Sequence, residues 1–99
     1  MKSERAIQLE YRQVKVQAGK LDECADEIKV VRQRLERLME ELRGSWEGES
    51  ASLYLEKCNE LSRKLKISSN NLDSTAKVIS RAADIYRAAE LAAIALAKN

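Results

Sequence analysis

The sequence has no proline, no phenylalanine and no histidine, and it has only three glycines among 99 residues. Sandwiches and barrels need a turn about every 8–12 residues, so the shortage of turn-forming residues argues against them. Without histidine, a Ser-His-Asp or Cys-His catalytic site is excluded. With two cysteines and no histidine, a zinc site would need carboxylates for most of its ligands, which is unusual. We therefore expect a non-enzymatic protein with no catalytic residue, no metal and no cofactor.

An excess of charge of one sign is also missing. The chain has 18 basic and 16 acidic residues, and its net charge is +2. Residues 1–45 carry 10 basic and 9 acidic side chains, and residues 46–99 carry 8 and 7. Because neither half forms a basic stripe, the sequence predicts no binding of nucleic acid.

A long hydrophobic run is absent as well. No apolar segment follows the first five residues, so we expect no signal peptide of the Sec type. The longest apolar run, residues 91–97, would be about 10 Å long as a helix and cannot cross a bilayer of about 30 Å. We expect no stable membrane insertion, and any export would follow a route independent of a signal peptide.

Apolar residues recur instead at intervals of seven, which is typical of packed amphipathic helices. One series comprises Ile7, Val14, Leu21, Ile28, Leu35 and Leu42, and the other comprises Ala51, Cys58, Leu65, Leu72, Ile79, Tyr86 and Ala93. Further apolar residues lie three or four positions from these. The predicted core and dimer stripe consists of Val14, Leu21, Ile28, Leu35, Leu42, Leu61, Leu65, Leu72 and Ile79.

The two series are out of register, and the break falls near residues 43–50. Gly44 suits the left-handed position that ends a helix, and Ser45 suits the first position of a new one. The sequence therefore predicts one all-α domain over residues 1–99. Its first helix spans about 5–43, its turn about 44–48 and its second helix about 46–92.

Two long helices joined by so short a turn pack as an antiparallel helix-turn-helix hairpin. A hairpin covers only one side of each apolar stripe, and the exposed remainder is typical of an interface. We therefore expect two copies to form a four-helix bundle. A homodimer is the default because symmetric pairs are commonest, and a heterodimer with a paralogue is the alternative.

The two cysteines are not expected to form a disulfide within the chain. If the hairpin folds about Trp46, residue i faces roughly residue 92 − i. Cys24 and Cys58 are then about 15 Å apart along the helices, beyond the ~7 Å limit between their Cα atoms. We expect both to be reduced.

The turn contains Trp46-Glu47-Gly48 close to the middle of the chain, and Tyr86 is followed four residues later by Glu90. With its length and its two amphipathic segments, the chain resembles the WXG family of small type VII secretion substrates, which are helical hairpins of the early-secreted-antigen type. Members, or their dimer partners, carry Trp-X-Gly in the turn and Tyr-X-X-X-Asp/Glu near the end of the second helix. The residues of this chain that match are Trp46, Gly48, Tyr86 and Glu90.

This resemblance implies that the chain is cytoplasmic before export and is then secreted in folded, dimeric form. It also implies that the two motifs form a composite export signal across the dimer, which the membrane-bound secretion ATPase recognises. A role in virulence or in competition between bacteria would follow. In an alternative role, a cytoplasmic helper of the same shape pairs with the helical N-terminal domain of a larger type VII toxin. A third possibility is a coiled-coil scaffold unrelated to secretion, but the register break at the turn argues against it.

Overall fold

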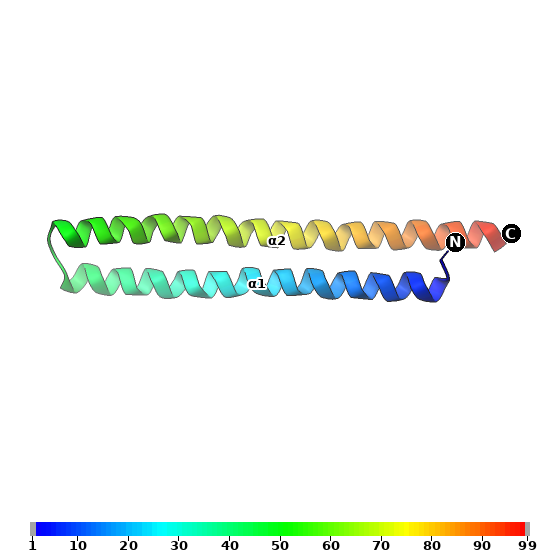
Figure 1. The fold of residues 1–99 in the computed structure, drawn as a ribbon, viewed down its shortest axis with the longest axis horizontal. Coiled ribbons are helices and arrows are strands. Elements are labelled where there is room, and N and C mark those ends of the chain that lie inside the picture. Colours follow the sequence, from blue (N-terminus) through cyan, green and yellow to red (C-terminus); the bar gives the residue numbers. More distant parts are fainter. Residues whose placement is uncertain (1, 99) are drawn as a thin grey trace. The chain divides into compact units, whose positions relative to one another are not determined.

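The computed structural model describes residues 2–98, and in it the chain forms two helices (Figure 1). Helix α1 spans Glu4–Ser45 and helix α2 spans Glu49–Lys98, with residues 46–48 between them. No strand occurs in the described part of the chain. The prediction of an all-α protein is confirmed.

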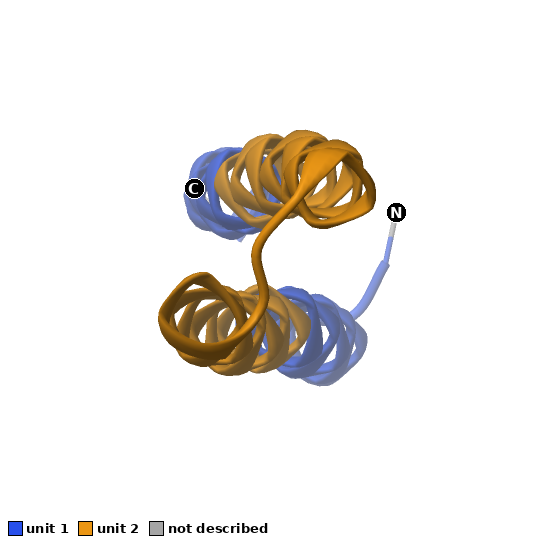
Figure 2. Ribbon diagram, turned by 90° about the vertical axis from the view of Figure 1, so that its left-hand side faces the viewer, with its two compact units in different colours: residues 1–22, 73–99 blue, residues 23–72 orange. Residues whose placement is uncertain are grey.

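The chain divides into two compact units, and each contains a segment of both helices (Figure 2). Unit 1 comprises residues 1–22 and 73–99, and unit 2 comprises residues 23–72. In unit 1, Tyr11 bonds to Asp84 and Lys15 bonds to Ser80, so rising numbers in α1 meet falling numbers in α2. In unit 2 the helix segments are joined directly by residues 46–48. The predicted antiparallel hairpin is therefore confirmed.

Both helices end later than expected, and α1 also begins one residue earlier. At the start of α1, the Ser3 hydroxyl accepts a hydrogen bond from the Ala6 N–H at 3.1 Å, which caps the helix. Helix α2 begins at residue 49 rather than 46, and it ends at residue 98 rather than 92. Its last residues are rich in alanine, the best helix former, and Lys98 lies where a positive charge favours the helix end.

The turn uses different residues from those expected. Gly44 and Ser45 belong to α1, and the Ser45 hydroxyl donates to the Glu41 carbonyl at 2.9 Å instead of capping α2. The Trp46 N–H still donates to the Leu42 carbonyl at 2.8 Å, which continues the hydrogen bonding of α1. Gly48, with φ of 113°, is the glycine with the positive φ.

In unit 1 the helix register differs by three residues from the expected one. The pairs 11 with 84 and 15 with 80 each add to 95, so residue i of this unit faces about residue 95 − i instead of 92 − i. The reason is that residues 46–48, rather than Trp46 alone, form the centre of the connection. In unit 2, Cys24 is exposed, Cys58 is buried, and neither forms a disulfide.

The contact between the two helices in each unit is made mainly of small side chains. Small residues allow two helices to approach closely, but each buries little apolar area. Apart from Ile7 and Met39, the bulky aliphatic residues lie beside this seam rather than within it. The buried seam residues are Ile7, Ala18, Ala76 and Ala83 in unit 1, and Ala25, Met39, Ala51, Cys58, Ser62 and Ser69 in unit 2.

Neither helix, over the residues described, contains a stretch apolar enough and long enough to cross a membrane.

Candidate functional site

The connection between the helices carries the Trp46-Glu47-Gly48 motif in unit 2. Trp46 is 40% exposed, and its ring centroid lies 5.7 Å from that of Tyr54 in a tilted arrangement. This spacing is within the favourable range for aromatic pairs. The contact fixes the indole against the first turns of α2 while part of its surface stays open to a partner.

Gly48 is required by the backbone at this point. Its φ of 113° lies in a region that residues with a Cβ rarely adopt. The Gly48 carbonyl accepts a hydrogen bond from the Ser52 N–H at 3.1 Å, which starts the hydrogen bonding of α2. The glycine of the motif therefore sets the direction in which the chain enters α2.

Tyr86 and Glu90, the second pair of predicted residues, lie on α2 in unit 1. Tyr86 is 47% exposed, and Glu90 is half-buried. The Lys2 ammonium donates to the Tyr86 hydroxyl at 3.3 Å, and it lies 5.5 Å from the ring centroid. It also pairs with Glu10 at 2.8 Å. Trp46 and Tyr86 belong to different units, so neither unit by itself brings the two motifs together.

A polar cluster in unit 1 links α1 to α2 next to Tyr86. Asp84 accepts a hydrogen bond from the Tyr11 hydroxyl at 2.6 Å and pairs with Lys15 at 2.9 Å. Lys15 also donates to the Ser80 hydroxyl at 2.6 Å. The Arg87 guanidinium lies 3.8 Å from the centroid of the Tyr11 ring, a cation–π contact. The cluster therefore fixes residues 80–87 of α2 against α1.

These contacts shift two pKa values in opposite directions. The hydrogen bond from Tyr11, followed by that from Lys15, lowers the pKa of Asp84 below its ordinary value of 3.8. The hydrogen bond to Asp84 raises the pKa of Lys15 above 10.5. Asp84 therefore stabilises the folded state above pH 3.8, and this stabilisation is lost as the pH falls through its lowered pKa. The contribution of Lys15 is present below pH 10.5 and is lost as the pH rises through its raised pKa.

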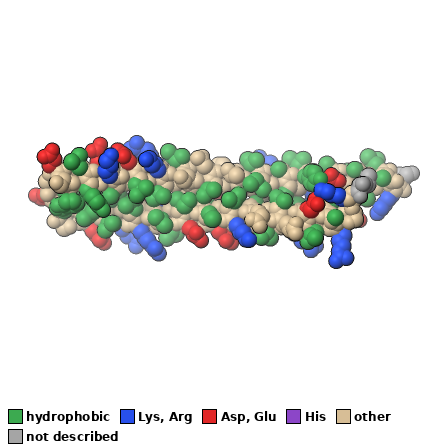
Figure 3. Space-filling view, viewed as in Figure 1, with side chains coloured by type: hydrophobic (Ala, Val, Ile, Leu, Met, Phe, Trp, Pro, Cys, Tyr) green, Lys and Arg blue, Asp and Glu red, His purple; other side chains and the backbone are tan. Residues whose placement is uncertain are grey.

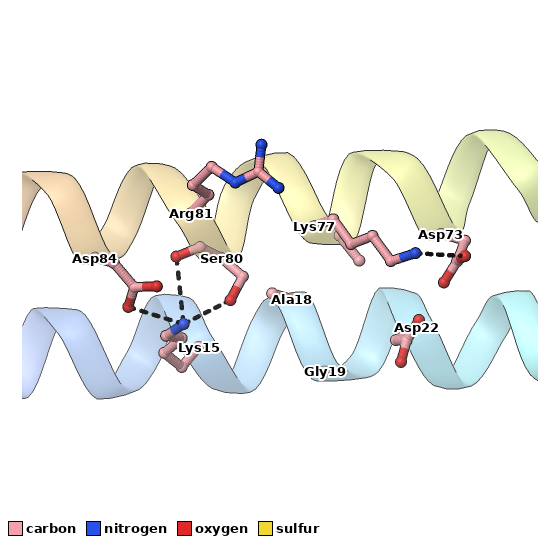
Figure 4. A pocket seen from close by; sticks show the side chains of 10 residues that line it. Lys15, Ala18, Gly19, Asp22, Asp73, Lys77, Ser80, Arg81 and Asp84 are labelled. Atoms are coloured by element: carbon pink, nitrogen blue, oxygen red, sulfur yellow. Dashed lines mark hydrogen bonds and ion pairs between the residues drawn. The ribbon is translucent and has the colours of Figure 1, made fainter.

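A groove of about 460 Å³ lies beside this cluster in unit 1 (Figure 4). Its three acidic and three basic side chains balance, so it favours no ligand of one charge sign. Lys77 pairs with Asp73 at 3.4 Å along one wall. The groove is lined by Lys15, Ala18, Gly19, Asp22, Asp73, Ala76, Lys77, Ser80, Arg81 and Asp84.

The nine predicted stripe residues flank the seam. Val14 and Leu61 are 38% and 49% exposed, and the other seven are half-buried. In unit 2 these residues adjoin further exposed apolar side chains, and together they form what we term the apolar face. Figure 3 shows hydrophobic side chains gathered along the line between the helices of unit 2, near the connection. The apolar face of unit 2 comprises Ile28, Val31, Leu35, Leu38, Leu42, Tyr54, Leu61, Leu65 and Leu72.

Nothing in the described residues resembles a metal centre, because no three acidic or cysteine side chains lie together there. Sequence reasoning missed the contact of Lys2 with Tyr86 and the polar cluster. One feature of the sequence could have indicated polar contacts beside the apolar series of α1. Charged residues recur there at intervals of seven, namely Lys15, Asp22, Lys29 and Glu36.

Comparison with known proteins places most of the chain within one family. A family model described as "Proteins of 100 residues with WXG" matches residues 6–91, and this range includes all four predicted motif residues. No curated protein and no solved structure gave a match to the chain.

Proposed function

Because the chain belongs to the WXG100 family, we propose that it is a type VII secretion substrate that is exported as a folded dimer of helical hairpins. Members of this family are small helical proteins associated with type VII secretion, they typically form dimers, and they are not known as enzymes. In this proposal residues 1–99 act as one hairpin domain. The chain is cytoplasmic until it is exported without a signal peptide.

One observation carries the proposal. The Trp46-Glu47-Gly48 motif forms the connection between the helices, and Trp46 remains 40% exposed there despite its contact with Tyr54. A buried tryptophan would need no further explanation, since it would only close the end of the helix pair. A large exposed aromatic on a turn fixed by glycine is instead suited to recognition. We assign Trp46 and Gly48 to one part of the export signal, and Tyr86 and Glu90 to the other.

The apolar face supports association with a second copy. Its side chains are aliphatic or aromatic, and four of them, Val31, Leu38, Tyr54 and Leu61, are between 47% and 50% exposed. Pairing two such faces would bury them in a four-helix bundle, with Val14, Leu21, Ile28, Leu35, Leu42, Leu61, Leu65, Leu72 and Ile79 at the contact. A homodimer is the simplest such assembly, and a paralogous partner would use the same surface.

The charge distribution favours an antiparallel arrangement of the two copies. Residues 40–60, around the connection, contain six acidic and two basic side chains. In unit 1, residues 2–20 and 77–98 contain nine basic and four acidic side chains. An antiparallel dimer places the acidic segment of one protomer beside the basic segments of its partner, whereas a parallel dimer would place like charges together. This arrangement would also bring the Trp46 motif of one protomer toward Tyr86 of the other.

The experiment is an export assay in cells that produce the protein. We expect Trp46→Ala and Tyr86→Ala each to abolish export while the purified variants still sediment as folded dimers. Leu53→Ala and Ile85→Ala are matched controls because these neighbouring apolar side chains are 57% and 66% exposed but lie outside both motifs. Both controls should be exported normally.

Normal export of the Trp46 and Tyr86 variants would overturn the assignment of the motifs. If the unmodified protein stays in the cytoplasm, and is monomeric until a larger toxin with a helical N-terminal domain is added, the helper role replaces the substrate role.

A further inference from the structure

The Tyr86 side chain is held from outside α2, by a residue that precedes α1. Lys2 lies two residues before Glu4, the first residue of α1. Its ammonium donates to the Tyr86 hydroxyl at 3.3 Å and lies 5.5 Å from the ring centroid. The same ammonium donates to Glu10 at 2.8 Å, so Glu10 anchors Lys2 in place.

The bond with Lys2 determines whether the Tyr86 hydroxyl acts as a hydrogen-bond donor or acceptor toward a partner. An ammonium has donors only, so the phenol oxygen must be the acceptor in its bond with Lys2. Among residues 2–98 no acceptor receives the phenol O–H of Tyr86. A phenol whose oxygen accepts from a cation becomes a stronger donor, because successive hydrogen bonds polarise one another. Tyr86 as a whole is 47% exposed, so a binding partner can reach its side chain.

We propose that Lys2 is a positioning residue for the tyrosine part of the export signal, holding the Tyr86 phenol so that its O–H donates to a carboxylate or carbonyl oxygen of the secretion receptor. The inference rests on the proposed function of Tyr86 and adds two points to it. The signal includes a residue that precedes α1, and the receptor contributes a hydrogen-bond acceptor rather than an apolar pocket alone.

The contact of Lys2 with Tyr86 and Glu10 contributes little to the stability of the fold. The side chains of Lys2 and Glu10 are 46% and 44% exposed, and ion pairs at this exposure contribute little to folding. Other contacts, from Tyr11 and Lys15 to Asp84, fix the same segment of α2. Removing the Lys2 ammonium should therefore change recognition without unfolding unit 1.

The test compares export of Lys2→Met, Lys2→Arg, Tyr86→Phe and Tyr86→Ala with that of the unmodified protein. Loss of one charge-assisted hydrogen bond should lower export of Lys2→Met and of Tyr86→Phe by roughly tenfold each. Lys2→Arg keeps a cation and its donors, so it should retain export. Lys20→Met, which removes an exposed lysine elsewhere on α1 in unit 1, is the matched control and should be exported normally. The melting temperatures of all variants should lie within a few degrees of one another.

The outcomes separate this inference from the proposed function. If Tyr86→Ala abolishes export but Lys2→Met and Tyr86→Phe are exported normally, the tyrosine belongs to the signal and the role of Lys2 is wrong. If Lys2→Arg fails as completely as Lys2→Met, the cation is not what matters and the inference is overturned. Normal export of Tyr86→Ala would overturn both the inference and the tyrosine part of the proposed signal.

Discussion

Single residues determine how the two helices are joined. Gly44 and Gly48 lie four residues apart, and an added Cβ would meet no atom within 4 Å at either position. They differ in backbone conformation, because Gly44 is helical and Gly48 has φ of 113°. Space therefore does not limit either position, and only the conformation at Gly48 requires glycine.

Gly48→Ala should lower the free energy of unfolding by about 1–3 kcal/mol, since it forces a residue with a Cβ into a region that glycine alone adopts readily. Gly44→Ala should raise it by up to about 1 kcal/mol, because alanine is the better helix former. Urea unfolding at a fixed protein concentration measures both. Equal effects of the two substitutions would show that the φ of Gly48 is not the reason for the glycine.

At the scale of the helices, a polar contact interrupts the small-residue seam of unit 2. The buried Ser62 hydroxyl donates to Glu36 and accepts from Arg32, with both distances 3.1 Å. Arg32 and Glu36 also pair with each other at 3.1 Å. Ser69 is buried as well, but its hydroxyl donates to the Lys66 carbonyl of its own helix at 3.0 Å. Only the first serine joins α1 to α2.

Ser62→Ala should lower the free energy of unfolding by about 1–2 kcal/mol, because it removes one hydrogen-bond partner from each of two partly buried charged groups. Ser69→Ala should change it by less than about 0.5 kcal/mol, since the lost bond is local and alanine favours the helix. The two variants are compared by chemical denaturation at equal concentration. A Ser69→Ala effect as large as that of Ser62→Ala would contradict the bridging role.

The seven-residue spacing was sufficient to predict two amphipathic helices, because apolar periodicity records which side of a helix is covered, and the short turn was sufficient to predict that they are antiparallel. The spacing did not predict which residues of α1 face which residues of α2. Trp46 looked like the centre of the fold, but its N–H still bonds within α1, and this moves the pairing from 92 − i to 95 − i. Backbone hydrogen bonds at a helix end leave little trace in composition.

The motif residues were predictable because their spacing is local to one helix or one turn. The contact of Lys2 with Tyr86 and the bonds of Tyr11 and Lys15 to Asp84 were not predicted. These pairs are 69 to 84 residues apart and depend on the exact register, and a shift of three residues moves a side chain almost one helical turn.

At the scale of the whole molecule, the seam buries small side chains and leaves the larger aliphatic ones partly exposed. Within unit 2, Leu61 on the apolar face and Ile67 outside it are 49% and 54% exposed. Ile67 is two positions from Leu65, so at about 100° per residue it points to roughly the opposite side of α2. The two residues therefore distinguish a specific interface from general surface hydrophobicity.

If the proposed dimer forms through the apolar face, Leu61→Asp should raise its dissociation constant at least tenfold, because the second copy would have to bury a carboxylate against aliphatic side chains. Ile67→Asp introduces the same charge on the same helix and should leave the dimer intact. Sedimentation equilibrium measures association, and circular dichroism checks that both variants remain helical. If Leu61→Asp is as dimeric as the unmodified protein, the apolar face is not the contact.

Apart from Ala51, the alanines and serines of the seam occupy different positions of the seven-residue repeat from the bulky side chains next to them. An exchange among the most exposed of these bulky side chains, Val31, Leu38, Tyr54 and Leu61, would leave the alanine and serine contacts of the seam in place. Paralogues of such a chain can therefore diverge in the dimer partner that they bind while each keeps the same helical hairpin. Pairing fidelity would then evolve separately from folding, through a few exchanges along one strip of surface.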